Sequence, residues 1–338
     1  MNTVLFPKSV KKALVALSVL SALALSSPAV LAADKPLEKF VYITNWYAQA
    51  EHGGFYQALA KGLYKEAGLD VTIKMGGPQV NILQLMAGGQ GDCVMGSESD
   101  MIIARSNGVP VTNLASSFQK DPQVMIAHEQ VKSFEEMKDK SLLIAPSAQQ
   151  SFWPWLKAKY GFTDAQVKPY TFNVQPFMLD KNAVQQGYLT SEPFAIEKEG
   201  VKANTFLLAD YGYGAYTTTV SCLDDTVAKR KEAVQAFIKA TMEGWKSYLA
   251  DPAAANELIK KDNPNMTDAQ LTYSVAKLKE MGIVDGGDAK TLGIGIMTPE
   301  RAKKNYDALV EYKLVDPAKA PFEKVYDFSL IKDLKILP

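Results

Sequence analysis

The sequence predicts an α/β protein of two lobes, joined by two crossing segments and with a ligand cleft between the lobes. Short apolar runs alternate with amphipathic stretches of helical spacing along the chain. About 305 residues remain after an N-terminal leader of 33, which is too many for one simple core. A strand end followed by a polar turn and a helix start recurs in both halves. In such folds the carboxyl ends of the strands hold the ligand.

Residues 1–33 have the pattern of a cleaved secretory signal peptide. Lys8, Lys11 and Lys12 form a basic front, an apolar run covers 13–25, and small residues suited to a signal peptidase close the segment. The run is too short to span a bilayer, and no later stretch is long and apolar enough to do so. We therefore expect a soluble, exported protein with no direct membrane insertion.

Charge and composition exclude several classes of partner. Lys and Arg number 37, as do Asp and Glu, so no basic excess attracts nucleic acid. Two histidines and two cysteines, His52, His128, Cys93 and Cys222, leave little material for a metal site, and we expect neither a metal nor a cofactor. The distance between the cysteines in the sequence does not favour a disulfide, but whether they are free stays open.

The first predicted unit is a strand, turn, helix and strand over residues 40–73. The helix has one apolar stripe and ends near Gly68, and 69–73 alternates like a strand. Asn45 and Trp46 fall just after the first strand, at its carboxyl end. Trp46 is there either to cover a ligand or to fill the core, and the residues alone leave both readings open.

A second polar turn follows the strand predicted at 92–95. Ser97 and Glu98 lie in this turn, which leads into a helix ending at Gly108. The backbone N–H groups of the turn and the serine hydroxyl could hold an acceptor group of a ligand. The alternative is that the serines of the turn only cap the helix.

The break at Asp121-Pro122 marks the first crossing, so we expect lobe 2 to cover 121–219 and lobe 1 to cover 34–120 and 220–338. In lobe 2 a strand at 142–145 ends in a polar turn that opens a helix. Ser147, Gln149 and Ser151 in that turn have the right chemistry for hydrogen bonds to a ligand, although helix capping would explain at least one of them.

The return crossing is predicted at 209–222, where a glycine-rich loop precedes a β-branched strand. The loop carries Tyr211, Tyr213 and Tyr216, and in a core each hydroxyl would need a partner. We therefore expect these rings, Tyr213 and Tyr216 above all, around the cleft. Stacked aromatic rings with a few polar groups suit a flat, neutral heterocycle.

The helix and strand after Asn45-Trp46 carry Ala58, Gly62, Tyr64 and Gly68-Leu69-Asp70-Val71. This pattern resembles the opening of bacterial solute-binding proteins of ABC importers, in the branch that includes thiamine-pyrimidine binders. The resemblance covers nearly the whole exported chain. It implies the type II periplasmic-binding-protein fold, a periplasmic location, a small-molecule ligand, and an ABC permease with its ATPase subunits as partner.

The same resemblance adds two residues near the end of a segment read as a helix from 179 and a strand at 187–189. Related proteins carry a comparable segment ending in Glu-Pro at the edge of the cleft, which implies that Tyr188 and Glu192 bind the ligand. Taken alone, a glutamate before a proline is usually solvated surface. We expect the segment to stop at Glu192-Pro193.

The branch also contains synthases that make the thiamine pyrimidine, and the comparison with them argues against an enzyme. They have a lysine for pyridoxal phosphate where this chain has Glu98, and a histidine where it has Ile102. The expected function is therefore capture of a small heterocycle, similar to a thiamine pyrimidine precursor, for delivery to a permease. The alternatives are a binding protein for a sulfonate, nitrate or aromatic acid, and an enzyme of the synthase-like family. Sulfonate or nitrate would want Arg or Lys at the cleft.

Overall fold

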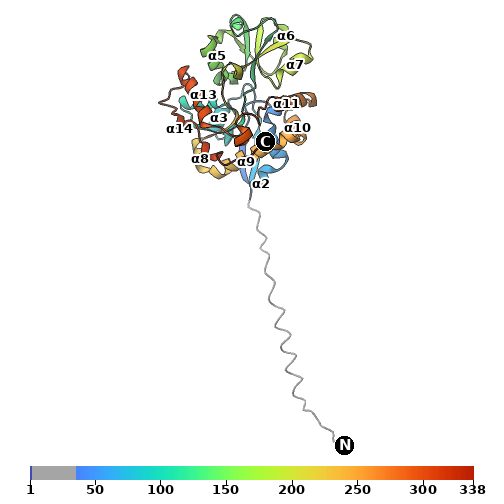
Figure 1. Cartoon of the computed structure of the whole chain (residues 1–338), viewed down its shortest axis with the longest axis vertical. Coiled ribbons are helices and arrows are strands. Elements are labelled where there is room, and N and C mark those ends of the chain that lie inside the picture. The colour runs from blue at the N-terminus through green and yellow to red at the C-terminus, as the bar shows by residue number, and fades with distance from the viewer. Residues whose placement is uncertain (2–35) are drawn as a thin grey trace. The chain divides into compact units, whose positions relative to one another are not determined.

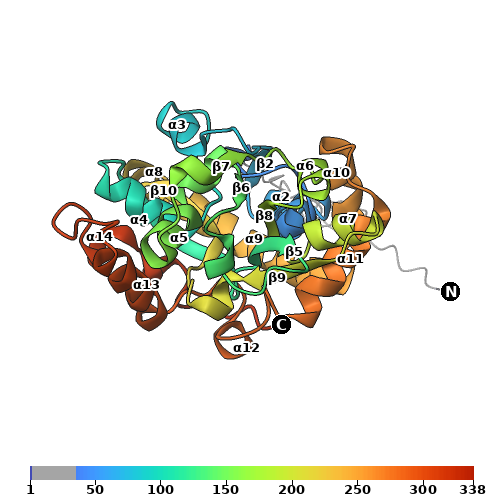
Figure 2. The same cartoon turned by 90° about the horizontal axis from the view of Figure 1, so that it is seen from above.

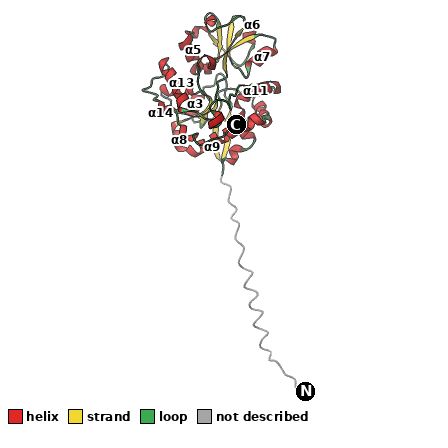
Figure 3. Cartoon of the chain, viewed as in Figure 1, coloured by secondary structure: helices red, strands yellow, loops and turns green. Residues whose placement is uncertain are grey.

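In the computed structural model, which describes Met1 and residues 36–338, the strands form two five-stranded sheets (Figures 1 and 3). The expected signal peptide lies outside the described residues, apart from Met1. Sheet A has the order β2-β1-β3-β10-β4 and consists of Leu69–Lys74, Glu38–Ile43, Cys93–Val94, Thr217–Leu223 and Val111–Phe118. Sheet B has the order β7-β6-β8-β5-β9 and consists of Val167–Pro169, Ser141–Ile144, Ala183–Tyr188, Gln123–His128 and Ala203–Leu207.

Helices cover both sheets, and we call each sheet with its own helices a lobe, lobe 1 for sheet A and lobe 2 for sheet B. The α-helices are α1 (Gly53–Ala60), α2 (Leu63–Glu66), α3 (Ile82–Ala87), α4 (Glu98–Ser106), α5 (Phe152–Tyr160), α6 (Gln175–Leu179), α7 (Glu192–Lys198), α8 (Asp224–Lys229), α9 (Lys231–Ala250), α10 (Ala253–Asp262), α11 (Asp268–Glu280), α12 (Ala289–Leu292), α13 (Pro299–Glu311) and α14 (Phe322–Val325). Short 3₁₀ helices are η1 (Ala50–His52), η2 (Glu135–Met137), η3 (Pro146–Gln150), η4 (Asp164–Gln166), η5 (Leu208–Tyr211) and η6 (Phe328–Leu330). None of the helices in the described part of the chain is long and apolar enough to cross a bilayer.

The two sheets share one topology. In sheet A, β1 pairs in parallel with β2 and β3, and β10 pairs antiparallel with β3 and β4. In sheet B, β6 pairs in parallel with β7 and β8, and β5 pairs antiparallel with β8 and β9. The chain passes between the sheets at 119–122 and again at 208–216. The predicted architecture of two α/β lobes is confirmed.

The close approach of α1 to α9 fixes the start of lobe 1. A Cβ atom on Gly54 would lie 2.2 Å from Cγ of Trp245, and one on Gly53 would lie 2.1 Å from Cε1 of Tyr248. Only glycine allows this packing, because any side chain would collide with the buried rings. The connection from β1 to α1, which carries Trp46, is therefore anchored against the core at its far end.

Cys93 and Cys222 form a disulfide, which corrects the sequence-based expectation. Their strands β3 and β10 are antiparallel neighbours, and the two cysteines lie directly opposite each other with Cα atoms 4.3 Å apart. The separation of 129 residues in the sequence carried no information about this register. The inserted strand β10 brings the distant cysteine beside the first.

The segment before Glu192 also differs from the prediction. The expected helix from 179 is instead the end of α6, a turn and strand β8, because residues 183–187 are buried between β6 and β5. Glu192-Pro193 begins helix α7 instead of ending the preceding segment, and proline is favourable in the first turn of a helix. Figure 2 shows α7 beside α11, where the rings of Phe194 and Tyr273 lie 5.0 Å apart.

Candidate ligand-binding site

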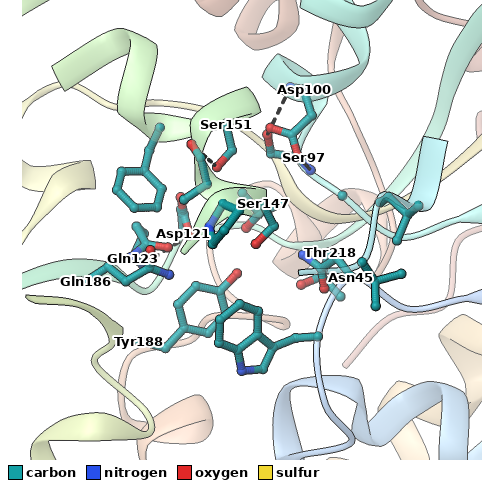
Figure 4. A pocket seen from close by; sticks show the side chains of 18 of the residues that line it. Asn45, Ser97, Asp100, Asp121, Gln123, Ser147, Ser151, Gln186, Tyr188 and Thr218 are labelled. Atoms are coloured by element: carbon teal, nitrogen blue, oxygen red, sulfur yellow. Dashed lines mark hydrogen bonds between the residues drawn. The ribbon is translucent and has the colours of Figure 1, made fainter. Parts of the chain in front are cut away.

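A cavity of about 270 Å³ lies between the two lobes, at the carboxyl ends of β1, β3, β6 and β8 (Figure 4). Its walls are the loops that follow these strands, closed by the two crossing segments near Asp121 and Tyr213. Loops at this edge of a parallel sheet can carry varied side chains on a rigid frame. The topology therefore places residues from both lobes around one small volume.

Seven of the ten residues predicted from the sequence line this cavity. They come from lobe 1, from lobe 2 and from the return crossing, and they are Asn45, Trp46, Ser97, Ser151, Tyr188, Glu192 and Tyr213. Figure 4 shows Asn45 and Thr218 facing Tyr188 across the pocket. That each of them touches the ligand remains a prediction, but the fold brings the seven together.

Trp46 lies between the lobes, at the wall of the cavity. Its half-buried ring stacks on Tyr170 of lobe 2, with centroids 6.3 Å apart and planes at 19°. Phe172, from the same loop of lobe 2, meets it edge-on at 6.2 Å. Trp46 therefore packs against the opposite lobe and lines the cavity as well.

Ser97 caps α4 and lines the cavity at the same time. Its hydroxyl donates to Oδ1 of Asp100 at 2.6 Å and accepts from the Asp100 N–H at 3.1 Å, while its own N–H donates to Oδ2 at 3.0 Å. This is a reciprocal capping arrangement, so the helix cap is confirmed, and a ligand contact of Ser97 remains a prediction. Asp100, which the sequence analysis did not select, is part of the same wall.

Glu192 is held rigidly at the start of α7. Its Oε1 accepts the hydroxyl of Tyr170 at 2.9 Å, and its Oε2 accepts the backbone N–H of Tyr188 at 2.7 Å. Burial of the carboxyl raises its pKa above the ordinary value, although these hydrogen bonds act in the opposite direction. The carboxyl faces the cavity in a fixed orientation and keeps lone pairs for a donor on a ligand.

Glu98 does not lie at the cavity, which corrects the prediction for this residue. Its side chain is 0% exposed, and its oxygens accept the backbone N–H of Tyr216 and the hydroxyl of Tyr326, each at 3.0 Å. Burial raises its pKa to about 8. As the first residue of α4 it turns toward the core, whereas Asp100 turns toward the cavity.

Tyr216 and Gln149 are also outside the lining. Tyr216 is buried in the core of lobe 1, where its hydroxyl accepts the Thr298 N–H at 3.0 Å and the Arg301 guanidinium lies 3.9 Å from the ring centroid. The partner that a buried tyrosine needs thus comes from the C-terminal part of the chain. Gln149 is exposed on η3, and its neighbours Ser147, Ala148 and Ser151 form the wall instead.

Several lining residues were missed, and one of them, Gln186, had a readable signal. Gln186 precedes Tyr188 by two positions in β8 and so shares its face of the strand. Its Oε1 accepts the Ala145 N–H at 2.7 Å, which ties the ends of β6 and β8 together. Asp121 was read only as part of a turn; its Oδ1 accepts the Gln123 N–H at 3.1 Å, and both side chains line the cavity.

The acidic side chains that line the cavity have no basic counterpart among the described lining residues. Three carboxyl groups line it, those of Asp100, Asp121 and Glu192, whereas none of the described lining residues is Lys or Arg. His52 adds no positive charge, because burial lowers its pKa to about 3. Within residues 36–338 there is also no group of three or more acidic, His or Cys side chains placed to hold a metal ion.

Direct contacts join the lobes around the cavity. The Ser147 N–H of lobe 2 donates to the Pro78 carbonyl of lobe 1 at 3.2 Å. On another side, the Thr190 hydroxyl donates to the buried carboxylate of Glu51. Residues of both lobes therefore line the cavity and contact each other beside it.

Comparison with known proteins places the chain among a defined set of relatives. A family described as NMT1/THI5 like matches residues 49–255. The riboflavin-binding protein RibY of Chloroflexus aurantiacus is 24% identical over 258 residues, 73% of each chain. The formylaminopyrimidine-binding protein of Halalkalibacterium halodurans is 26% identical over 236 residues, 67% of this chain and 71% of the relative.

The chain is also similar in sequence to enzymes, and in structure to proteins of lower sequence identity. The 4-amino-5-hydroxymethyl-2-methylpyrimidine phosphate synthase THI11 of Saccharomyces cerevisiae is 24% identical, over 64% of this chain and 69% of its own. A Candida albicans structure described as having the generic periplasmic binding protein fold superposes with a TM-score of 0.61 at 14% identity, covering 87% of this chain and 96% of that one. The alkanesulfonate-binding protein SsuA of Xanthomonas axonopodis pv. citri does so with a TM-score of 0.63 at 11% identity, covering 87% and 99%. These likenesses confirm the periplasmic-binding-protein fold.

Proposed function

We propose that this chain, which belongs to the NMT1/THI5-like family, is a solute-binding protein that captures a small, flat heterocycle bearing hydrogen-bond donors. One observation carries the proposal: the cavity between the lobes is lined by aromatic rings and three carboxyl groups and by no Lys or Arg among the described residues. Carboxylates accept hydrogen bonds and donate none when ionised, so they select ligands with N–H groups. An aminopyrimidine similar to a thiamine precursor has that chemistry.

The same lining argues against the anionic alternatives. A sulfonate or nitrate brought into the cavity would face Asp100, Asp121 and Glu192 without a compensating cation. An aromatic acid would meet the same repulsion. The fold shared with an alkanesulfonate-binding protein therefore does not extend to the ligand class.

The size of the cavity favours a compact ligand. Its volume of about 270 Å³ is just below the lower end of the roughly 300 to 1,000 Å³ range of small-molecule sites. One heterocyclic ring with short substituents suits this space better than a large fused system. Of the two relatives named for their ligands, the formylaminopyrimidine-binding protein is therefore the closer guide.

Mechanistically, the ligand would act by bridging the lobes. A solute that contacts Trp46 and Asn45 from lobe 1 and Tyr188 from lobe 2 binds the closed arrangement best and shifts the population toward it. A membrane permease with its ATPase subunits would then recognise the closed form in the periplasm. The resemblance to ABC importer components supports these partners and this location.

We propose a binding role without turnover. The lining has one histidine, His52, which is neutral, and no described lysine that could form a Schiff base. The synthases among the relatives are the competing indication. Incubation of the protein with candidate pyrimidines, followed by chromatography, tests this point, because a new product would identify an enzyme.

Thermal-shift screening tests the binding role itself. Aminopyrimidines, a flavin, sulfonates and nitrate are compared at equal concentration. A ligand at a hundredfold excess over its dissociation constant stabilises the folded protein by about 2.7 kcal/mol, which is a clear rise in the melting temperature. We expect the rise with an aminopyrimidine; a rise with the anions alone would refute the proposal.

A further inference from the structure

Asp100 and Asp121 lie on different segments of the chain but line the same cavity. Asp100 belongs to the first turn of α4, and Asp121 lies in the crossing segment between β4 and β5. Figure 4 shows Asp100 with its hydrogen bond to Ser97 and Asp121 beside Gln123. The two carboxyls are close enough for Asp100 to raise the pKa of Asp121, in addition to the larger effect of burial.

Neither carboxyl has a counter-ion within the described chain. No ion pair between residues 36 and 338 includes Asp100 or Asp121. Arg301 is near enough to favour the ionised form of Asp121, but it stacks on Tyr216, donates to the Gly214 carbonyl and does not line the cavity. Asp121 is only 3% exposed, so water screens it poorly.

A hydroxyl without a hydrogen bond also lines this cavity. Thr217 is 4% exposed and lines the cavity, and its Oγ1 makes no hydrogen bond. An isolated bridge pairs Thr217 with Ser97, whose N–H and hydroxyl donate to Asp100. Burial raises the pKa of Asp121 to about 7, and the nearby Thr217 hydroxyl acts in the opposite direction. Buried polar groups in folded proteins are normally paired, so a hydroxyl without a hydrogen bond, in a cavity lined by two carboxyls that have no counter-ion, indicates a polar ligand group at this wall.

We infer that the ligand carries a protonated nitrogen, as a primary ammonium or an amidinium, and that Asp100 and Asp121 select the cationic ligand over its neutral analogue. An ammonium has three donors, enough for Asp100, Asp121 and Thr217 together. Its charge offsets the repulsion between the two carboxylates. This inference rests on the proposed heterocycle-binding function and narrows its ligand class.

The test uses two forms of one aminopyrimidine, one with an aminomethyl arm and one with a hydroxymethyl arm. The arms are nearly equal in size and differ in charge at neutral pH. Titration calorimetry measures both dissociation constants with the full exported protein. We expect the aminomethyl form to bind at least about tenfold more tightly, the scale of one charge-assisted hydrogen bond.

Three variants assign the preference to the residues named. Asp121→Asn and Asp100→Asn keep the shape and remove one charge each, and we expect each to weaken binding of the aminomethyl form more than binding of the hydroxymethyl form, so that most of the preference is lost. Asp210→Asn is the control, because Asp210 carries the same charge in the return crossing, is 61% exposed and pairs with Lys120 outside the lining. It should keep the full preference.

The outcomes separate this inference from the proposed function. Equal binding of the two forms by the unaltered protein, or tighter binding of the hydroxymethyl form, overturns the inference and leaves the heterocycle-binding function intact. A preference that survives in both Asp variants overturns the role of Asp100 and Asp121. Binding of neither form, with a thermal shift only from anions, removes both proposals. The comparison in the unaltered protein decides the question even if a variant fails to fold.

Discussion

The ring of Phe172 stands edge-on to the indole of Trp46, with the planes at 88° and the centroids 6.2 Å apart. The two residues come from opposite lobes. The backbone of Phe172 has a φ of 65°, in the left-handed region that a residue with a side chain adopts only at a cost of roughly 1 to 2 kcal/mol. Contacts with Trp46 and Tyr47 across the lobes offset that cost. A strained loop of lobe 2 thus helps to position the tryptophan of lobe 1.

Trp46→Ala should weaken binding of the preferred heterocycle by about 1 to 3 kcal/mol, the scale measured for bases stacked on aromatic side chains. Titration calorimetry gives the value, and circular dichroism checks the fold. Trp46→Phe is the matched variant, because it keeps a stacking face and should lose much less. Unchanged affinity in Trp46→Ala would show that the ring only packs between the lobes.

A pair of substitutions at Phe172 separates backbone strain from the loss of the ring. Phe172→Ala and Phe172→Gly both delete the ring, but only alanine keeps a Cβ in the left-handed conformation. After allowance for the greater freedom of glycine in the unfolded chain, the Gly variant should be more stable by about 0.5 to 1 kcal/mol. Urea denaturation measures the difference. An Ala variant as stable as the Gly variant would mean that the loop relaxes once the ring is gone.

Glu192→Gln should weaken the binding of an aminopyrimidine by about 1.5 to 3 kcal/mol, since it removes the charge from a hydrogen bond to a ligand donor. The amide oxygen can still accept from Tyr188 or Tyr170, so the site keeps its shape. Glu98→Gln is the control, because Glu98 lies outside the lining and its substitution should leave affinity unchanged. If the Glu192 variant binds as the unaltered protein does, this carboxyl serves only to hold β8 and α7.

Glu98 should make stability depend on pH. Burial raises its pKa in the folded protein to about 8, while the unfolded value stays near 4.5. Between these values the folded form holds a proton that the unfolded form has lost, so raising the pH lowers the free energy of unfolding, by at most about 1.4 kcal/mol per pH unit for one group. Glu98→Gln should remove this contribution to the pH dependence of the free energy of unfolding. The variant should therefore become more stable relative to the unaltered protein as the pH rises from 5 toward 8. Urea denaturation at several pH values measures it, and identical slopes in both proteins would contradict the assignment.

Reduction of the Cys93–Cys222 disulfide should destabilise the protein by about 3 to 5 kcal/mol, because the bond closes a loop of more than a hundred residues in the unfolded chain. Denaturation with and without a thiol reductant gives the difference. The double variant Cys93→Ser/Cys222→Ser should be destabilised to a similar degree and should not respond to the reductant. A response in that variant would reveal an unspecific effect of the reagent.

Sequence reasoning reached those site residues whose position follows from the end of a single strand. Asn45 and Trp46 come directly after β1, and a local pattern was enough to place them. Sequence reasoning failed where the direction of a side chain depends on packing against residues far away in the sequence. Glu98 and Asp100 are two positions apart on α4, about 200° around the helix, so the choice of which faces the cavity belongs to the surroundings.

Long-range partners account for the other errors. The hydroxyl of Tyr216 accepts a hydrogen bond from the Thr298 N–H, 82 residues away in the sequence, and a local sequence pattern cannot reveal such a partner. The disulfide likewise depends on the insertion of β10 between β3 and β4. Asp121 illustrates a further limit, since an aspartate before a proline reads as a turn whether or not it also faces a cavity.

The interleaved order of the strands has a consequence for how the chain is made. Sheet B uses only residues 123–207, which are continuous, so it can be completed as soon as that part has been synthesised. Sheet A cannot, because β4 pairs with no strand of its sheet except β10, which ends at Leu223. During synthesis or export from the N-terminus, more than ninety residues must therefore follow β4 before its only partner strand in sheet A is available. Lobe 1, which begins first, is therefore completed only by residues from the second half of the chain. A truncation before β10 would leave β4 as an unpaired, aggregation-prone strand.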